Sequence, residues 1–411
     1  MTDYELYVGI DWATEAHQVC LLDPSGRRRE ERSVPHTGAG LAALADSLLT
    51  VVADPARIAV AIEVPRGAVV DTLLERGLHV FALNPKQLDR FRDRHTVAGA
   101  KDDRRDALVL ADALRTDREA FRRLQVEDPR LIHLRELSRL HDDVVREHTR
   151  LAHRLRDQLL RYFPQVLALC PAADEPWLWT LLTQASTPAV AQRLPLGALR
   201  TILRAHRIRR VSPETLHAAL QLPALRLAPG TVEAASEHVT LLLPRLRLIH
   251  DQRVQCERRL EEVLAALSTG AGPDAQQEHR DVTILRSLPG VGRVVAATML
   301  AEAPQPLAAR DYQTLRAHAG AAPVTKQSGK RAIVHMRYSC NRRLRDAVFH
   351  WARNSIKSDP HCRAHYQRLR QRHGHARALR GVADRSLRVL IAMLTTRTLY
   401  DPARWGGQIA A

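Results

Sequence analysis

The chain has 411 residues, which is too long for one ordinary hydrophobic core, so two or three domains are expected. Its formal charge of +17 favours a polyanionic partner such as nucleic acid, although a GC-rich genome would by itself enrich arginine. The five cysteines are odd in number and widely spaced, which argues against a small disulfide-bonded scaffold and against a zinc ribbon.

The opening residues lack the basic and then apolar pattern of a signal peptide. No run of about 18 apolar residues is present, so no membrane span is expected. We therefore expect a cytoplasmic bacterial protein, associated with the nucleoid if its partner is DNA.

The first part of the chain predicts an α/β domain with a mixed sheet. Residues 5–35 are predicted to form strands, of which the third is polar and lies near a sheet edge. Further strands are predicted at 57–64 and 78–84, and helices at 38–52, 66–76 and 103–116.

From about residue 130 the pattern changes to long amphipathic helices. Apolar residues at three-, four- and seven-residue steps predict a helix of coiled-coil type over 131–163. A second long helix is predicted near 232–268, where Pro244 should kink or interrupt it. The two helices could pair as an antiparallel hairpin or pair with another subunit. Between them, 165–230 predicts an inserted region of short helices.

The last part of the chain, after a Gly/Pro-rich linker at 269–278, predicts a mainly helical domain with one loop and strand-like segment near 319–339. The predicted fold class is thus α/β plus α. We expect three domains: 1–125 with the mixed sheet, 126–278 with the long helices, and 279–411 at the C-terminus.

Four acidic residues occur where carboxylates could converge. Asp11 ends the first strand and Glu63 ends the central one, while Asp103 and Asp106 share one face of a helix start. Such a set can hold two divalent cations that promote phosphoryl transfer. Each residue alone is as consistent with a solvated strand end or a capped helix, but the ordered set on a ribonuclease-H-like strand pattern favours a site for divalent metal ions.

The segment PVTKQSGKR contains a second candidate group. Ser328 precedes a glycine and is flanked by Lys326, Lys330 and Arg331, a setting that suits a hydroxyl nucleophile attacking a phosphate. An ordinary polar turn is the alternative, and no neighbouring residue in the sequence identifies a general base. Ser339 is the nearest competitor, but it lacks the glycine neighbour.

Other features point to nucleic-acid contacts. LPGVG contains Gly290 and Gly292 before an apolar helix, as in helix-hairpin-helix DNA-binding proteins, where backbone amides face a phosphate. The motif is weak on its own. A neighbouring basic surface would be formed by Arg337, Arg342 and Arg343.

In combination, these segments resemble a known family. VGIDWA, AIEVPRG and KDDRRDALVLADAL resemble the N-terminal DEDD domain of insertion-sequence transposases of the one-ten family, including its eleven-eleven branch. LRSLPGVG, AGAAPVTKQSGK, NRRLRDAVFHWA and the closing LYDP resemble the second domain of that family. One departure is Asp102, which stands where the family has Thr or Ser, so Asp102 and Asp103 compete for the metal-ligand role.

The resemblance implies a RuvC-like N-terminal domain in which Asp11, Glu63, Asp103 and Asp106 hold magnesium. It implies Ser328 as the nucleophile that forms a phosphoserine link to DNA. It further implies donor and target DNA, a noncoding bridge RNA as guide, and a homo-oligomer from dimer to tetramer with composite sites.

Two other functions remain open on sequence alone. A metal-dependent endonuclease of the Holliday-junction type would use only the carboxylates, and the serine segment speaks against it. A nucleic-acid-binding protein with a degenerate site would not need four intact carboxylates. The leading interpretation is a DNA recombinase of the transposase type.

Overall fold

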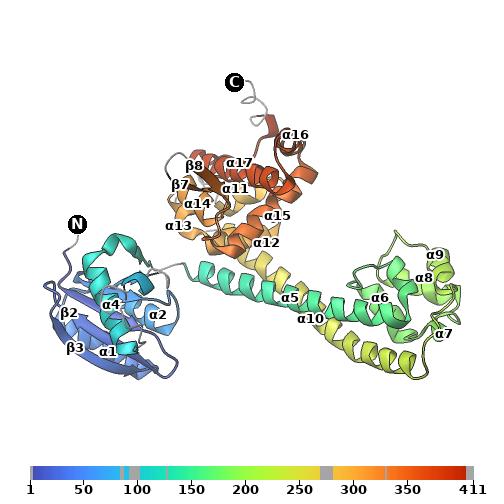
Figure 1. Cartoon of the computed structure of the whole chain (residues 1–411), viewed down its shortest axis with the longest axis horizontal. Helices are drawn as coiled ribbons and strands as arrows, with labels where there is room; N and C mark the ends of the chain where they lie inside the picture. The colour runs from blue at the N-terminus through green and yellow to red at the C-terminus, as the bar shows by residue number, and fades with distance from the viewer. Residues whose placement is uncertain are drawn as a thin grey trace. The chain divides into compact units, whose positions relative to one another are not determined.

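The computed structural model describes residues 3–83, 88–91, 102–125, 128–268, 281–328 and 331–403. The chain divides into two compact units, one ending at Asp128 and one beginning at Pro129, shown in Figure 1. No helix among the described residues is both long and apolar enough to cross a membrane.

The N-terminal unit is built on a six-stranded mixed sheet with the strand order β3-β2-β1-β4-β5-β6. Its central strands β1, β4 and β5 are parallel, and the outer pairs are antiparallel. The strands are β1 (Leu6–Asp11), β2 (Ala16–Leu22), β3 (Arg28–Pro35), β4 (Ile58–Ile62), β5 (His79–Ala82) and β6 (Arg122–Arg123). The polar strand β3 lies at an edge, as predicted, and the short edge strand β6 was not predicted.

Helices cover both faces of this sheet. The side chains of Leu6, Val8 and Ile10 pack with α1 (Gly38–Val51) and α2 (Ala68–Glu75) on one face. The small side chains of Ala59 and Ala61 pack with α4 (Asp103–Thr116) on the other. Two short 3-10 helices, η1 (Pro55–Arg57) and η2 (Arg118–Ala120), lie in the connections. The mixed sheet with helices confirms the predicted fold class.

The second unit contains the two long helices, α5 (Pro129–Tyr162) and α10 (Thr231–Ser268), which pack along each other within one chain (Figure 1). The sequence left open whether the long helices pair with each other or with another subunit. Here Leu151 and Leu155 are buried within the same chain. Helix α10 continues through Pro244, so the expected interruption does not occur. Pro244 is exposed, and the backbone carbonyl that loses its amide partner can therefore bond water.

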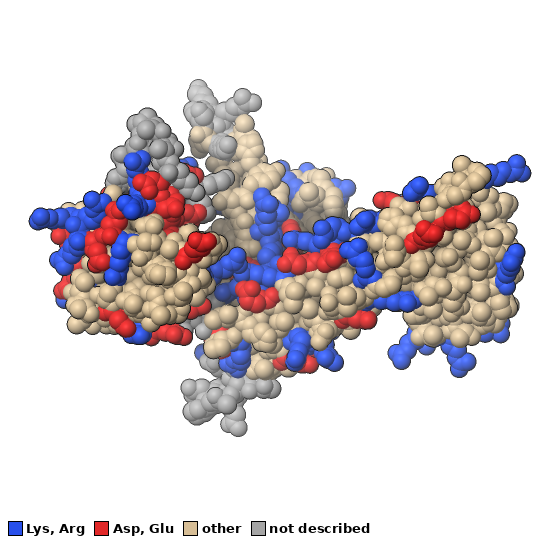
Figure 2. All heavy atoms as spheres, turned by 90° about the horizontal axis from the view of Figure 1, so that it is seen from below, with Lys and Arg blue, Asp and Glu red and all other residues tan. Residues whose placement is uncertain are grey.

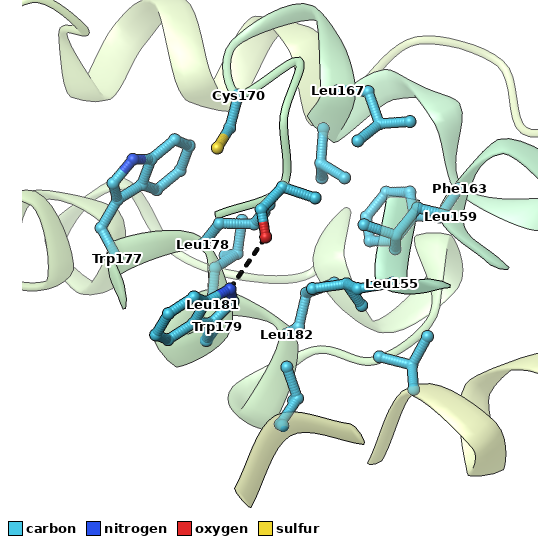
Figure 3. Close-up of a cluster of buried hydrophobic side chains, with 14 of the residues drawn as sticks. Leu155, Leu159, Phe163, Leu167, Cys170, Trp177, Leu178, Trp179, Leu181 and Leu182 are labelled. Carbon is cyan, nitrogen blue, oxygen red and sulfur yellow. Dashed lines mark hydrogen bonds between the residues drawn. The ribbon is translucent and has the colours of Figure 1, made fainter. Parts of the chain in front are cut away.

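Short helices pack around one end of this pair, as the sequence predicted. They are η3 (Pro164–Ala168), α6 (Pro176–Gln184), α7 (Pro188–Ala191), α8 (Leu196–Ala205) and α9 (Pro213–Leu220). Figure 3 shows their core, where the buried rings of Trp177, Trp179 and Phe163 lie among leucines of α5 and α6. The indole Nε1 of Trp179 donates to the Ala173 carbonyl oxygen at 3.0 Å, so this buried polar atom has a partner.

The C-terminal part of the second unit is mainly helical, with one hairpin, β7 (Val324–Ser328) and β8 (Arg331–His335). Its core surrounds the buried Trp351. The helices are α11 (Asp281–Ser287), α12 (Arg293–Glu302), α13 (Pro304–Ala308), α14 (Tyr312–His318), α15 (Arg342–Ser358), α16 (Pro360–Arg370) and α17 (His375–Thr396).

Candidate functional site

Asp11 and Glu63 lie at the ends of neighbouring parallel strands. The register pairs Gly9 with Ala61 and Ile10 with Ile62, so Glu63 follows at the level of Asp11. Side chains alternate along a strand, and Ile10 and Ile62 face α1 and α2. Continued alternation therefore predicts that Asp11 and Glu63 lie on the opposite, α4 side of the sheet.

Helix α4 is seated on β1 at Gly9. A Cβ on Gly9 would lie 1.9 Å from the Ala107 carbonyl oxygen and 2.6 Å from the Ala111 amide nitrogen, so only glycine permits this approach. Asp106 precedes Ala107 on the helix and is 2% exposed. Asp103 lies one turn earlier and is exposed. Close packing at Gly9 thus brings the start of α4 to the strand end that carries Asp11.

The four carboxylates do not form a closed cation cage in this structure. Among the described residues, no three of them have ligand oxygens within 4.8 Å of one another. Asp102 has a local role, because it is the N-cap of α4 and its Oδ1 accepts from the Arg104 amide at 3.1 Å. This capping bond explains an acidic residue at 102 and favours Asp103 as the metal-facing member of the pair.

Ser328 is the last residue of β7 and pairs with Arg331, the first residue of β8. The backbone therefore places Ser328 at one end of a two-stranded ribbon. The side chains of Ser328, Lys326 and Arg331 lie outside the described part of the structure, as does the whole of Lys330. The competitor, Ser339, is exposed in the segment after β8.

The three arginines predicted to contact nucleic acid differ in the partners that their guanidinium groups already bond. The Arg343 guanidinium bonds Asp142 Oδ2 at 2.5 Å and Glu302 Oε1 at 3.0 Å, and its side chain is only 19% exposed. Arg337 Nε donates to the Ala322 carbonyl oxygen at 3.3 Å. Arg342 is exposed, and of the three it is the best placed to contact a phosphate.

The two glycines of LPGVG also differ. Gly290 has φ of +82°, and a Cβ there would lie 2.6 Å from the Ser355 amide nitrogen, so its packing against α15 already requires glycine. Gly292 is the N-cap of α12, and no described atom lies within 4 Å of the place a Cβ would take. The predicted phosphate contact is therefore more consistent with Gly292 than with Gly290.

Sequence reasoning missed two residues near these groups. Gln18 pairs with Asp11 across the antiparallel ladder, so its amide lies on the α4 side beside the carboxylates. The alternation of Gln18, Cys20 and Leu22 could have indicated this. Glu302 accepts from Asn341 Nδ2 at 2.7 Å as well as from Arg343, and nothing in the sequence indicated that network.

On the face shown in Figure 2, positive charge does not form one uninterrupted patch, because Lys and Arg side chains are interspersed with Asp and Glu on both units. Ion pairs such as Arg115 with Asp112 at 2.7 Å account for part of this pattern. A basic surface for nucleic acid is therefore expected in a smaller region of the molecule.

Comparison with known proteins bears directly on these residues. A transposase family model of the DEDD IS110 type matches residues 8–164, and the model described as transposase IS116/IS110/IS902 family matches residues 282–367. The first match contains all four carboxylates, and the second contains Ser328 and the LPGVG turn.

Individual relatives agree with the family models. A Sinorhizobium fredii protein assigned as a transposase is 50% identical over 51% of this chain, and the alignment spans 59% of that protein, so the chain covers less than two thirds of it. A Streptomyces coelicolor protein assigned as the mini-circle transposase for IS117 is 34% identical over 97% of this chain and 96% of its own length. An uncharacterized 43.6 kDa protein of the insertion element IS110, also from Streptomyces coelicolor, is 29% identical over 97% of this chain and 96% of its own. The chain belongs to the IS116/IS110/IS902 family of transposases.

Proposed function

We propose that this transposase cleaves and rejoins DNA strands through two sets of residues, the carboxylates of the N-terminal unit and the hydroxyl of Ser328. The observation that carries the proposal is the parallel register of β1 and β4. It aligns Asp11 with Glu63 on the side of the sheet where α4 carries Asp103 and Asp106.

The carboxylates fit a divalent cation by their chemistry and placement. Asp11 and Glu63 supply hard oxygen ligands at adjacent strand ends, and the nearly buried Asp106 lies where the helix contacts β1. Magnesium or manganese would be held by Asp11, Glu63, Asp103 and Asp106. Bound there, the ion would supply Lewis-acid stabilisation of charge on phosphate oxygens.

Ser328 would act as the nucleophile. Its Oγ forms a bond to phosphorus, the bond from phosphorus to the leaving deoxyribose oxygen breaks, and the serine proton ends on the leaving hydroxyl. The resulting phosphoserine ester conserves the phosphodiester energy, so a strand can be rejoined without ATP. Lys326, Lys330 and Arg331 would neutralise the phosphate charge, and Arg342 and Gly292 would contact the DNA backbone.

Guidance by a noncoding bridge RNA, which pairs with donor and target DNA, is part of the same proposal. An RNA partner held through phosphates is consistent with the charge of +17. Sequencing of the RNA that copurifies with the protein should show enrichment of sequence flanking the element. A random cellular mixture would contradict guided recognition.

Assembly into a dimer or tetramer, with coiled-coil contacts between long helices, would complete the site. On α5, Leu151 and Leu155 are buried by their own chain and Leu140 is 50% exposed, while more strongly exposed leucines lie on α10. There Leu241 is 73% exposed and Leu248, one heptad later, is 59% exposed. Light scattering that shows a monomer with and without DNA and RNA would contradict assembly.

The test of the proposed function compares Ser328→Ala with Ser339→Ala in the full chain. We expect Ser328→Ala to bind DNA but to lose both recombination and the covalent protein–DNA adduct that survives denaturation. Ser339→Ala should retain all three properties. An adduct that persists in Ser328→Ala would remove the serine mechanism and favour a nuclease that uses the carboxylates alone.

A further inference from the structure

The β7–β8 hairpin exposes apolar side chains on both of its faces. The two strands form a separate two-stranded sheet, and Ile333 and Val334 on β8 are 41% and 56% exposed. Successive strand residues point to opposite faces, so neither face is covered at these positions. A two-stranded ribbon of this kind is marginally stable by itself, which indicates that a partner covers it.

Tyr338, just after this hairpin, is the most exposed large apolar side chain among the described residues, at 77%. The preceding residue, Arg337, donates to the carbonyl oxygen of Ala322, which lies just before β7. This bond fixes Tyr338 near the end of the ribbon opposite Ser328. The Tyr338 side chain makes no ring contact and no hydrogen bond with any other described residue.

The segment that carries this surface contains charged residues of one sign. The sequence contains no Asp or Glu from Tyr312 to Arg345, but it contains eight Lys and Arg residues there. Arg316 is neutralised by Asp384, and Arg343 by Glu302 and Asp142, whereas Arg342 is exposed. An exposed ring beside uncompensated positive charge is complementary to a nucleic-acid strand with unstacked bases, rather than to an apolar protein surface.

We propose that Tyr338 is a stacking platform for an unpaired base of the DNA strand that the hairpin holds. The ladder from Ser328 to Val324 spans about 14 Å at 3.4 Å per residue, so the stacked base would lie a few nucleotides from the phosphate that Ser328 attacks. This assignment rests on the proposed function, which identifies the strand as DNA. Tyr338 would then favour DNA that is locally melted beside the cleavage position.

Binding of the full chain to single-stranded DNA, to the same sequence as duplex and to the same sequence as RNA tests this assignment. Tyr338→Ala should weaken single-strand DNA binding about ten-fold, the scale of one base–aromatic stack, and change duplex binding by less than about two-fold. Tyr338→Phe should bind like the wild type, because stacking does not need the hydroxyl. Leu222→Ala, at an exposed apolar site after α9 that has no part in the proposed function, is the matched control and should have no effect.

A fluorescent base analogue in the single strand reports stacking directly. Its fluorescence should be quenched by the wild type, by Tyr338→Phe and by Ser328→Ala, but not by Tyr338→Ala. Equal binding and quenching by Tyr338→Ala would overturn the proposal, as would a loss confined to RNA. Quenching by Ser328→Ala together with a persistent adduct would refute the serine mechanism and leave the stacking role intact.

Discussion

The contact between Gly9 and α4 offers a direct test of how the carboxylates are positioned. In Gly9→Ala the new methyl group would meet the Ala107 carbonyl oxygen at 1.9 Å, where an ordinary contact is about 3.4 Å or longer. The obstacle is helix backbone, which cannot move by changing a rotamer, so α4 must shift away from β1. Overpacking of this kind costs about 3 kcal/mol, and the shift moves Asp103 and Asp106 away from Asp11.

Hydrogen exchange followed by mass spectrometry measures this cost within the full chain. Peptides from α4 and β1 should lose about 3 kcal/mol of protection in Gly9→Ala, while peptides from α5 and α6 in the other unit should be unchanged. Gly38→Ala, at the start of α1 where a Cβ meets nothing within 4 Å, is the matched control and should be neutral or slightly stabilising. If Gly9→Ala has the hydrogen-exchange protection and the DNA cleavage of the wild type, the close approach of α4 to β1 is refuted.

Three further predictions concern other contacts. Glu302→Gln should lower the free energy of unfolding by about 2 kcal/mol in urea titrations, because the poorly exposed Arg343 loses one of its two charge partners and keeps Asp142. The exposed Glu136→Gln should cost less than about 0.5 kcal/mol, and equal losses in the two variants would contradict this prediction. In hydrogen-exchange measurements, Gly290→Ala should lower the protection of α15, whereas Gly292→Ala should leave it unchanged. A larger loss of protection in Gly292→Ala than in Gly290→Ala would contradict the contacts found at the two glycines. Burial, and then the neighbouring His36, lowers the pKa of His17, so the unfolded chain binds more protons than the folded one at acidic pH. The stability of β2 should therefore fall below about pH 6.5. His17→Gln should flatten this dependence of stability on pH, and an unchanged pH profile would exclude His17 as its source.

Much of the fold was predictable because local patterns and tertiary packing agree. The short apolar run containing Ile58 and Ile62 forms the central strand, and the acidic start of KDDRRDALVLADAL begins α4 at Asp103. Leucine periodicity likewise identified α5. In each case the residues that pack are periodic in sequence, so one pattern determines both the element and its buried face.

What the sequence could not provide is the pairing between distant segments. Of the kink or interruption predicted at Pro244, the interruption does not occur, because the exposed proline leaves the freed carbonyl to solvent and α10 is continuous. Arg343 and Arg342 are adjacent and identical in type, yet only the structure distinguishes the ion-paired residue from the exposed one. The same holds for Gly290, whose role depends on a backbone sixty-five positions away at Ser355.

The most direct measurement is to map the covalent attachment. The wild-type protein would be reacted with donor and target DNA in the presence of magnesium, denatured, digested with nuclease and protease, and analysed by tandem mass spectrometry. We expect a nucleotide linked through phosphate to Ser328, and its loss in Asp11→Asn. A nucleotide on any other residue, or strand exchange with no protein-linked nucleotide, would contradict it.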